Sequence, residues 1–141
     1  MIREATLADT RDLTQLMSVL GYPTETSSMR QRMSDIFNRE DYQTFVYERN
    51  EKVVGMIGMT FHVAYHTDAP HVRVIAFVVD QEFQGEGIGR KLMEETEAWA
   101  RTKHAKTIIL NSGNRQERKS AHHVYEHFGF EGRATGFYKK L

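Results

Sequence analysis

The sequence predicts an α/β domain built on a mixed sheet. Segments with strand-like hydrophobicity alternate with segments of helical periodicity, and the apolar run Val74 to Val79 suits a strand buried on both faces. A glycine cluster then joins this strand to an amphipathic helix. The expected order of elements is β α α β β β α β α β. Its central strand–helix–strand unit should be a right-handed parallel crossover, with antiparallel strands on either side.

The composition is that of one globular domain. The chain has 141 residues, 40% hydrophobic and 27% charged, which leaves no room for a second core. Lys plus Arg equal Asp plus Glu, 19 against 19, so no global basic charge favours nucleic acid or membrane as a partner. The chain contains no cysteine, which excludes disulfides, thiolate zinc sites and a cysteine nucleophile. Without an apolar run that could serve as a signal peptide or membrane span, we expect a cytoplasmic protein.

The first part of the chain is predicted to form a strand and two helices. A short strand at Ile2 to Ala5 precedes Thr6-Leu7-Ala8-Asp9, an approximate capping box with Asp9 in place of the usual Glu. The helix that it opens should end at Gly21. A second amphipathic helix follows, with one apolar face made of Met29, Met33, Ile36 and Phe37.

The middle of the chain is predicted to supply most of the sheet. Thr44 to Arg49 and Lys52 to His62 are β-rich, and Asn50-Glu51 between them predicts a hairpin. Val72 to Asp80 is the strand that precedes the glycine cluster. After the cluster we expect a helix and then a buried strand at Thr107 to Asn111. The apolar stripe of that helix consists of Ile88, Leu92, Thr96 and Trp99.

The end of the chain is predicted to add one helix and one strand. Ala121, Val124, Tyr125 and Phe128 share a helical face, and Gly129 should close that helix. The tail from Thr135 to Leu141 is predicted to be the final strand.

The glycine cluster is the most informative stretch. Gln84-Gly85-Glu86-Gly87-Ile88-Gly89 leads directly into a helix, so N–H groups free of side chains join a helix N-terminus that suits a phosphate. A P-loop would need Lys and then Ser or Thr where Arg90-Lys91-Leu92 stands, and a dinucleotide fingerprint would need glycine at Arg90 and an acid within Lys106 to Leu110. Both nucleotide interpretations fail, and a turn without a ligand stays as the alternative.

These residues carry a resemblance to a known family. Gln84 to Gly89 is similar to the Q/R-x-x-G-x-G/A motif of the GCN5-related N-acetyltransferase (GNAT) superfamily, in the same strand–loop–helix context. Ile2 to Thr6 with Asp9 resembles the family's opening strand and first helix. Ala121 to Phe130 resembles its Ala-x-x-x-Tyr-Glu-x-x-Gly-Phe segment. The resemblance covers essentially the whole chain, 1–141, as a single N-acetyltransferase domain, with a weaker likeness to aminoglycoside-acetylating members.

The resemblance implies a fold and a co-substrate. The fold is a GNAT-like single domain with a mixed, mostly antiparallel sheet of six or seven strands, about four helices and one splayed pair of parallel strands. The co-substrate is acetyl-coenzyme A. The backbone of Phe77, Val78 and Val79 would bind its pantetheine arm. The motif would hold its pyrophosphate, with Gln84, Gly85, Glu86, Gly87, Ile88, Gly89 and Arg90 as the binding residues.

The resemblance also assigns a catalytic residue. Tyr125 matches the family's tyrosine that protonates or hydrogen-bonds the departing thiolate; because it shares a helical stripe with Val124 and Phe128, a core tyrosine is the alternative. Where many members have a coenzyme-binding asparagine, seven residues earlier, this chain has Arg118. Arg118 could meet the coenzyme's phosphates instead, and Asn114 could substitute after a shift of the loop.

The general base is the main departure from the family pattern. Its usual glutamate positions correspond to Ile75 and Asn111, neither of which accepts a proton usefully. Either the amine arrives unprotonated, or water takes part, or another group serves. The candidate groups are Glu48, His62, His66 and His71.

The predicted reaction is direct transfer of an acetyl group to an amine of a small molecule or a peptide. The alternative is an acyl-coenzyme A-binding sensor without turnover. The histidine spacings match no zinc motif, so we expect no metal. The sequence leaves a homodimer open.

Overall fold

The computed structural model describes residues 1–111 and 125–141. The chain forms two compact units, Met1–Ile109 and Leu110–Leu141. A five-stranded sheet has the order β1-β2-β3-β4-β5, and its first three neighbouring pairs are antiparallel. β5 follows β4 through a helix and joins the sheet beside it, which makes the sheet mixed, as predicted. The strands are β1 (Ile2–Glu4), β2 (Tyr42–Arg49), β3 (Lys52–His62), β4 (His71–Val79) and β5 (Thr107–Leu110).

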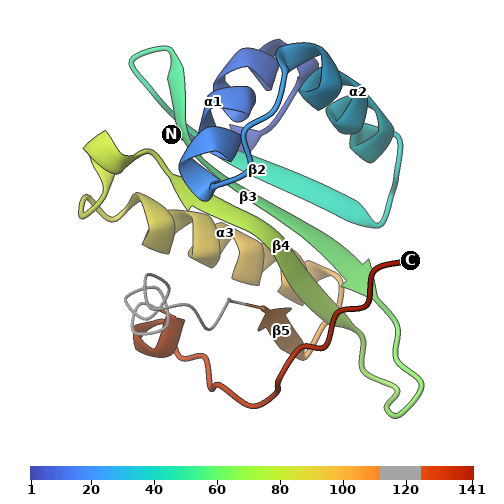
Figure 1. Cartoon of the computed structure of the whole chain (residues 1–141). Helices are drawn as coiled ribbons and strands as arrows, with labels where there is room; N and C mark the ends of the chain where they lie inside the picture. Colours follow the sequence, from blue (N-terminus) through green and yellow to red (C-terminus); the bar gives the residue numbers. More distant parts are fainter. Residues whose placement is uncertain (112–124) are drawn as a thin grey trace. The chain divides into compact units, whose positions relative to one another are not determined.

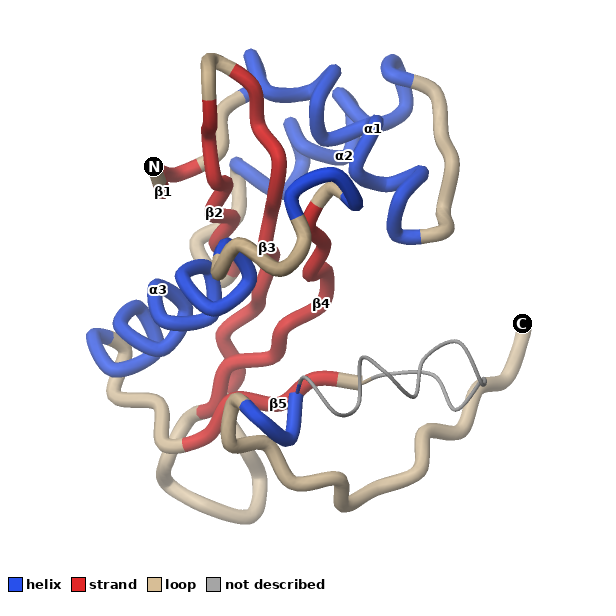
Figure 2. Tube along the Cα trace, turned by 90° about the vertical axis from the view of Figure 1, so that its left-hand side faces the viewer, coloured by secondary structure: helices blue, strands red, loops and turns tan. Residues whose placement is uncertain are grey.

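Helices cover both faces of this sheet. α1 (Thr10–Leu20) and α2 (Thr26–Phe37) lie together on one face, and α3 (Ile88–Thr102) lies on the other, as Figure 1 and the turned view in Figure 2 show. One buried cluster joins α1 and α2 to the sheet; it includes Leu13, Leu16, Met29, Met33, Val46 and Met56. α3 buries Ile88, Leu92, Met93, Thr96 and Ala100, whereas Trp99, expected on the stripe, is only half-buried.

The predicted N-terminal capping box is present. The Thr6 N–H donates to Asp9 Oδ2 at 2.8 Å, and a 3₁₀ turn, η1 (Leu7–Asp9), leads into α1. Gly21 ends α1 with a φ of +105°, and its N–H donates to the carbonyls of Met17 and Ser18. Both ends of α1 are therefore specified by local residues, as the sequence predicts.

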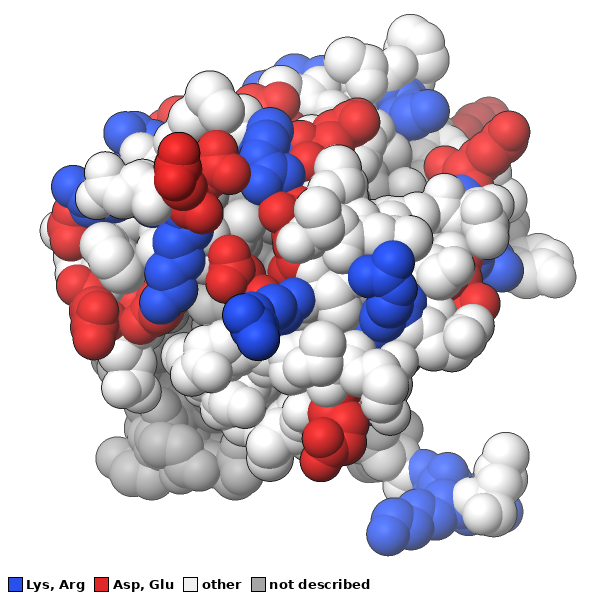
Figure 3. All heavy atoms as spheres, turned by 90° about the horizontal axis from the view of Figure 1, so that it is seen from above, with Lys and Arg blue, Asp and Glu red and all other residues white. Residues whose placement is uncertain are grey.

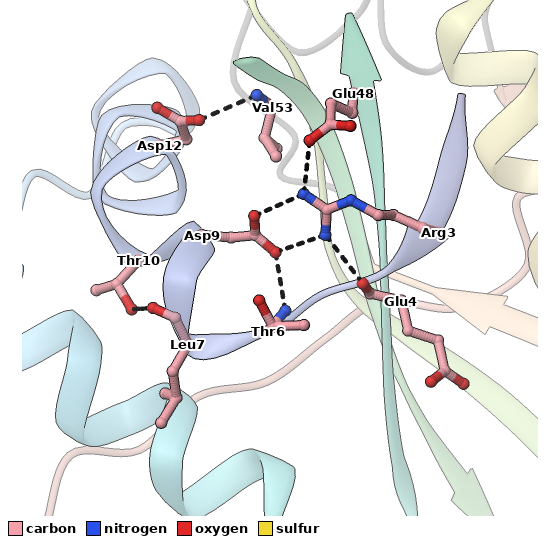
Figure 4. A network of polar contacts seen from close by, with 9 residues as sticks. All are labelled: Arg3, Glu4, Thr6, Leu7, Asp9, Thr10, Asp12, Glu48 and Val53. Atoms are coloured by element: carbon pink, nitrogen blue, oxygen red, sulfur yellow. Dashed lines mark hydrogen bonds and ion pairs between the residues drawn. The ribbon is translucent and has the colours of Figure 1, made fainter. Parts of the chain in front are cut away.

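A partly buried ion pair ties this turn to the sheet (Figure 4). The Arg3 guanidinium donates to both oxygens of Asp9 at 2.8 Å and to Glu48 Oε1 at 3.0 Å. The Asp9 side chain is 7% exposed, so a bidentate, charge-assisted contact replaces the water that it loses. The hydrogen bonds from Arg3 hold the pKa of the Asp9 carboxyl below its usual value. Arg3 thereby joins β1, the start of α1 and β2.

The β2–β3 hairpin has the predicted turn. Asn50 and Glu51 have φ values of 52° and 65°, the left-handed pair that a two-residue hairpin loop requires. In β4 the prediction of continuous burial is wrong at Ile75, which is 50% exposed. The pairing runs from Gly58↔Ala76 to Met59↔Val74, so Ile75 is an extra residue in a β-bulge.

The second half of the chain departs from the prediction in two respects. β5 is half-buried, not buried as expected. Residues 135–141 form no strand, and Phe137, Tyr138 and Leu141 are 92%, 87% and 116% exposed. Aromatic residues favour strands only where a neighbouring strand and a covered face receive them. The described residues therefore form five strands, not the six or seven expected. Tyr125–His127 is helical and Gly129 ends that helix with a φ of +93°, as predicted.

Charges of both signs are mixed on the face seen in Figure 3, with basic and acidic side chains side by side. This agrees with the equal numbers of basic and acidic residues. None of the described helices is long and apolar enough to cross a membrane.

The Arg3–Asp9 contact gives a stability prediction. Asp9→Asn should lower the free energy of unfolding at pH 7 by about 2 kcal/mol, because charge-assisted hydrogen bonds to a buried group are lost. The pKa of Asp9 is lowered in the folded state, so the stabilisation is complete above the ordinary aspartate value of about 3.9 and disappears as the pH falls through the lower, folded value. Chemical denaturation at several pH values measures the difference.

The matched control is Asp41→Asn. Asp41 also pairs with an arginine, Arg39, at 3.0 Å, but both side chains are exposed, and such pairs contribute little. Equal losses of stability in the two variants would show that the Arg3–Asp9 contact contributes no more to stability than an exposed ion pair.

Candidate functional site

The glycine loop lies between the end of β4 and the start of α3. A second 3₁₀ turn, η2 (Gln81–Phe83), follows β4, and Asp80 Oδ1 caps it by accepting from the Glu82 N–H at 3.1 Å. The Gln84 side chain donates to the Val79 carbonyl at 3.1 Å. The first residue of the motif therefore folds the loop back onto the last residue of β4.

Two glycines shape the loop and leave its surface open. Gly85 and Gly87 have φ values of +82° and +83°, and a Cβ built at either position would meet no atom within 4 Å. Gly87 is the N-cap residue of α3, and it has no side chain that could accept a hydrogen bond from the first turn. An α-helix leaves its first N–H groups without partners inside the helix and concentrates positive potential there. This arrangement suits an anionic group that approaches the backbone closely.

Glycines also bring α3 close to the sheet. A Cβ at Gly55, on β3, would lie 3.1 Å from Ile88 Cγ2 and 3.2 Å from Leu92 Cδ1. A Cβ at Gly89 would lie 3.5 Å from the Phe77 ring, an ordinary contact. The first turns of α3 therefore rest directly on β3 and β4, and this packing sets the position of the loop.

A charged side chain of β2 contacts the glycine loop. Arg49, at the end of β2, forms an ion pair with Glu86 of the loop, and its guanidinium lies 5.5 Å from the centre of the Phe83 ring. The hydrogen bond that Arg49 donates to Glu86 raises the pKa of Arg49. Lys91 lies 5.7 Å from the centre of the Tyr47 ring. Arg49 offsets the negative charge that Glu86 would otherwise present to an anion at the loop.

The β-bulge lies two residues before the stretch Phe77 to Val79. Beyond it, Phe77, Val78 and Val79 pair in register with Ile57, Met56 and Gly55 of β3. The other neighbour of β4 is β5, which has four residues, whereas β4 has nine. β5 can therefore pair with only part of the length of β4.

Tyr125 belongs to the second unit. It begins the described part of the last helix, its side chain is half-buried, and its ring meets Phe130 edge to face at 6.3 Å. The Phe130 N–H donates to the Tyr125 carbonyl at 3.0 Å. The other two predicted coenzyme contacts, Asn114 and Arg118, lie outside the described residues.

The four candidate bases lie in different surroundings. Glu48 accepts from Arg3 in a partly buried contact. His62 and His71 face each other across β3 and β4 with ring centres 5.2 Å apart, at the end of the hairpin away from the glycine loop. Burial lowers the pKa of His71, and the nearby His62 and Arg73 act in the same direction. His66 is exposed in the β3–β4 loop. No cluster of three metal-ligating side chains occurs among the described residues.

Two features were missed from the sequence. One is the β-bulge, whose available indication was the isolated Gly58 within a strand pattern. The other is a cavity of about 150 Å³ between α1, α2 and the sheet, bounded by Gly58, Ile75 and Ala76 at the bulge. Its lining comes from five elements of the chain, α1, α2, β2, β3 and β4, so no local pattern predicts it.

Comparisons with known proteins agree with this geometry. The family model described as acetyltransferase (GNAT) family matches residues 8–130. A GNAT family acetyltransferase from Staphylococcus aureus is 30% identical, with a TM-score of 0.86 over 100% of this chain and 98% of that one. No curated protein sequence matches the chain.

More distant structures share the fold. A glucosamine-6-phosphate N-acetyltransferase from Arabidopsis thaliana is 19% identical, with a TM-score of 0.83 over 100% of this chain and 97% of that one. An aminoglycoside acetyltransferase from an uncultured soil sample, in complex with sisomicin, is 18% identical, with a TM-score of 0.79 over 100% and 95%.

The open loop gives a binding prediction. Gly87→Val should abolish binding of acetyl-coenzyme A, because a branched side chain at a φ of +83° distorts the loop and covers its N–H groups. The matched control is Gly21→Val, since Gly21 also has a positive φ and open space around it but ends α1. It should carry a similar backbone strain and retain the affinity. Calorimetry on the two folded variants measures the difference; equal affinities would reject the loop as the site.

Proposed function

Since the chain belongs to the GNAT family of acetyltransferases, we propose that residues 1–141 form one N-acetyltransferase domain that uses acetyl-coenzyme A. The acceptor is a primary amine of a small molecule. The observation that carries the proposal is the open loop of Gly85 and Gly87 at the start of α3. A pyrophosphate placed there directs the rest of the coenzyme along β4 toward the bulge.

In this proposal some residues bind the coenzyme and one donates a proton. N–H groups from Gly85 to Arg90 hold the pyrophosphate, and the backbone of Phe77, Val78 and Val79 holds the pantetheine arm. Acetyl-coenzyme A supplies a thioester whose carbonyl carbon accepts the amine nitrogen and whose sulfur leaves. Tyr125 donates its phenolic proton toward that sulfur, which avoids an unprotonated thiolate in a water-poor site.

Direct transfer in a ternary complex is the simplest route. The chain has no cysteine that could carry an acyl-enzyme. The amine therefore attacks the thioester itself. The names of two distant structures refer to glucosamine 6-phosphate and aminoglycosides, so amines of small molecules are acceptors of other proteins with this fold.

One observation favours a second function. Ile75, which is 50% exposed, stands where the family commonly has a glutamate base. A domain that binds acyl-coenzyme A without turnover would need no such base. Release of free thiol during incubation with a panel of amines separates the two functions, because a sensor would bind the coenzyme and release none.

The role of Tyr125 gives a kinetic prediction. Tyr125→Phe keeps the ring and its contact with Phe130, so a core tyrosine would lose about 1 kcal/mol of stability at most. A leaving-group acid would lower kcat by about 100-fold or more, with little change in coenzyme affinity. Steady-state kinetics with a thermal melt and calorimetry measure all three quantities.

The control is Tyr138→Phe, whose parent residue is 87% exposed in the tail. It should leave kcat, stability and affinity unchanged. If kcat of Tyr125→Phe stayed within about threefold of the parent, Tyr125 would be a core residue and the sensor function would gain support.

A further inference from the structure

The cavity between α1, α2 and the sheet has an apolar lining. Its volume is about 150 Å³. Four of the chain's seven methionines line it, and their thioethers are flexible and polarisable, which lets one cavity fit ligands of different outline. The methionines are Met17 from α1, Met29 and Met33 from α2, and Met56 from β3.

The cavity begins where the reaction is expected. Ile75 and Ala76 of the β4 bulge form one wall, directly before the stretch Phe77 to Val79 that would hold the pantetheine arm. Gly58 faces them from β3, and a Cβ there would lie 3.8 Å from Ala76 Cβ and from Met56 Cε. The missing side chain of Gly58 therefore adds to the space beside the bulge.

The polar groups of the lining include no negative charge that could pair with a cation. They are Arg32, Tyr42 and Thr44, and the described lining contains no carboxylate. Arg32 lies at the exposed side of α2, where its guanidinium donates to Thr24 Oγ1 at 2.9 Å. An ammonium group in this cavity would lose its hydration without gaining an opposite charge, and it would be repelled by Arg32.

We propose that this cavity holds the acceptor, and that the acceptor is a primary amine with a small alkyl or aryl body, bound in its neutral form. The inference rests on the proposed function and adds the substrate class to it. The size fits such a body, since an apolar protein cavity of about 150 Å³ accommodates benzene. The same lining disfavours acceptors with a second cationic group.

The same cavity explains how the amine is activated without a base. Removal from water disfavours the charged form of the amine, so the bound acceptor keeps its lone pair. The nitrogen then bonds to the thioester carbonyl carbon, the carbon–sulfur bond breaks, and the nitrogen loses one proton while the sulfur gains one. The reaction of a neutral amine to give a free thiol therefore neither consumes nor releases a net proton. Neither Glu48, which is held by Arg3, nor the distant His62 and His71 is required.

The test compares butylamine with putrescine, which differ only by a second amine at the far end of a four-carbon chain. We expect kcat/KM for butylamine to exceed that for putrescine by at least about tenfold, because the second cation cannot be desolvated. Arg32→Gln should reduce this ratio by removing repulsion. Arg30→Gln is the matched control, since Arg30 is exposed on the same helix but does not line the cavity.

Gly58→Leu tests the location. Its Cβ makes only ordinary contacts, so the larger side chain should fill the cavity. It should weaken butylamine binding to the coenzyme A complex by about tenfold or more in calorimetry, with coenzyme affinity unchanged.

The pH profile adds a third measurement. As the pH rises, kcat/KM for butylamine should increase until the pH passes the pKa of the free amine, which is about 10.4 for a comparable lysine side chain. The profile of kcat should break at a lower pH, because desolvation acts on the bound amine.

The outcomes separate this inference from the proposed function. Equal kcat/KM values for the two amines, or butylamine binding that Gly58→Leu does not weaken, would overturn the inference while thiol release with any amine upholds the transferase. Butylamine binding that is lost in Gly58→Leu, without thiol release from any amine, would uphold the cavity as the amine site and reject turnover.

Discussion

The contact between Gly55 and α3 is the constraint on which the rest of the site depends. Because β3 has no side chain at this point, Ile88 and Leu92 come to rest against its backbone. The first turn of α3 is thereby fixed next to the end of β4, and Gly85 and Gly87 are held in the short segment between them. Three residues further along β3, Gly58 faces the opposite side of the sheet and widens the methionine cavity. One strand thus shapes an anion loop on one face and an apolar cavity on the other.

The position of Glu48 illustrates why a carboxylate near a site need not be a base. Glu48 accepts from Arg3, which also holds Asp9 at the start of α1. Its carboxylate is already engaged in a contact that fixes helix against sheet, and protonation by an amine would weaken that contact. Asp12 serves similarly, since it accepts from the Val53 N–H at 3.0 Å and ties α1 to β3. These two carboxylates are therefore engaged in contacts that hold the helical layer on the sheet.

Local chemistry explains which parts of the fold could be predicted from the sequence. The capping box of Thr6 and Asp9, the left-handed turn at Asn50 and Glu51 and the glycine loop are each specified by residues adjacent in the chain. The bulge at Ile75 could not be predicted, because it depends on the register between β3 and β4. The tail from Thr135 looked like a strand by composition alone, and composition does not supply a neighbouring strand. The cavity could not be predicted either, because its lining comes from α1, α2, β2, β3 and β4.

In an apolar acceptor site, removal from water would both select the acceptor and favour its reactive neutral form. A carboxylate base would attract ammonium groups of every kind and would then have to remove a proton from each. A methionine lining does the reverse, since it admits the neutral amine, whose population in water falls about tenfold for each pH unit below its pKa. The free energy that deprotonates the acceptor then comes from the solvent equilibrium and from burial of the apolar body. Turnover at neutral pH therefore depends on how much apolar surface the acceptor carries, which ties the rate of the chemistry to the shape of the cavity.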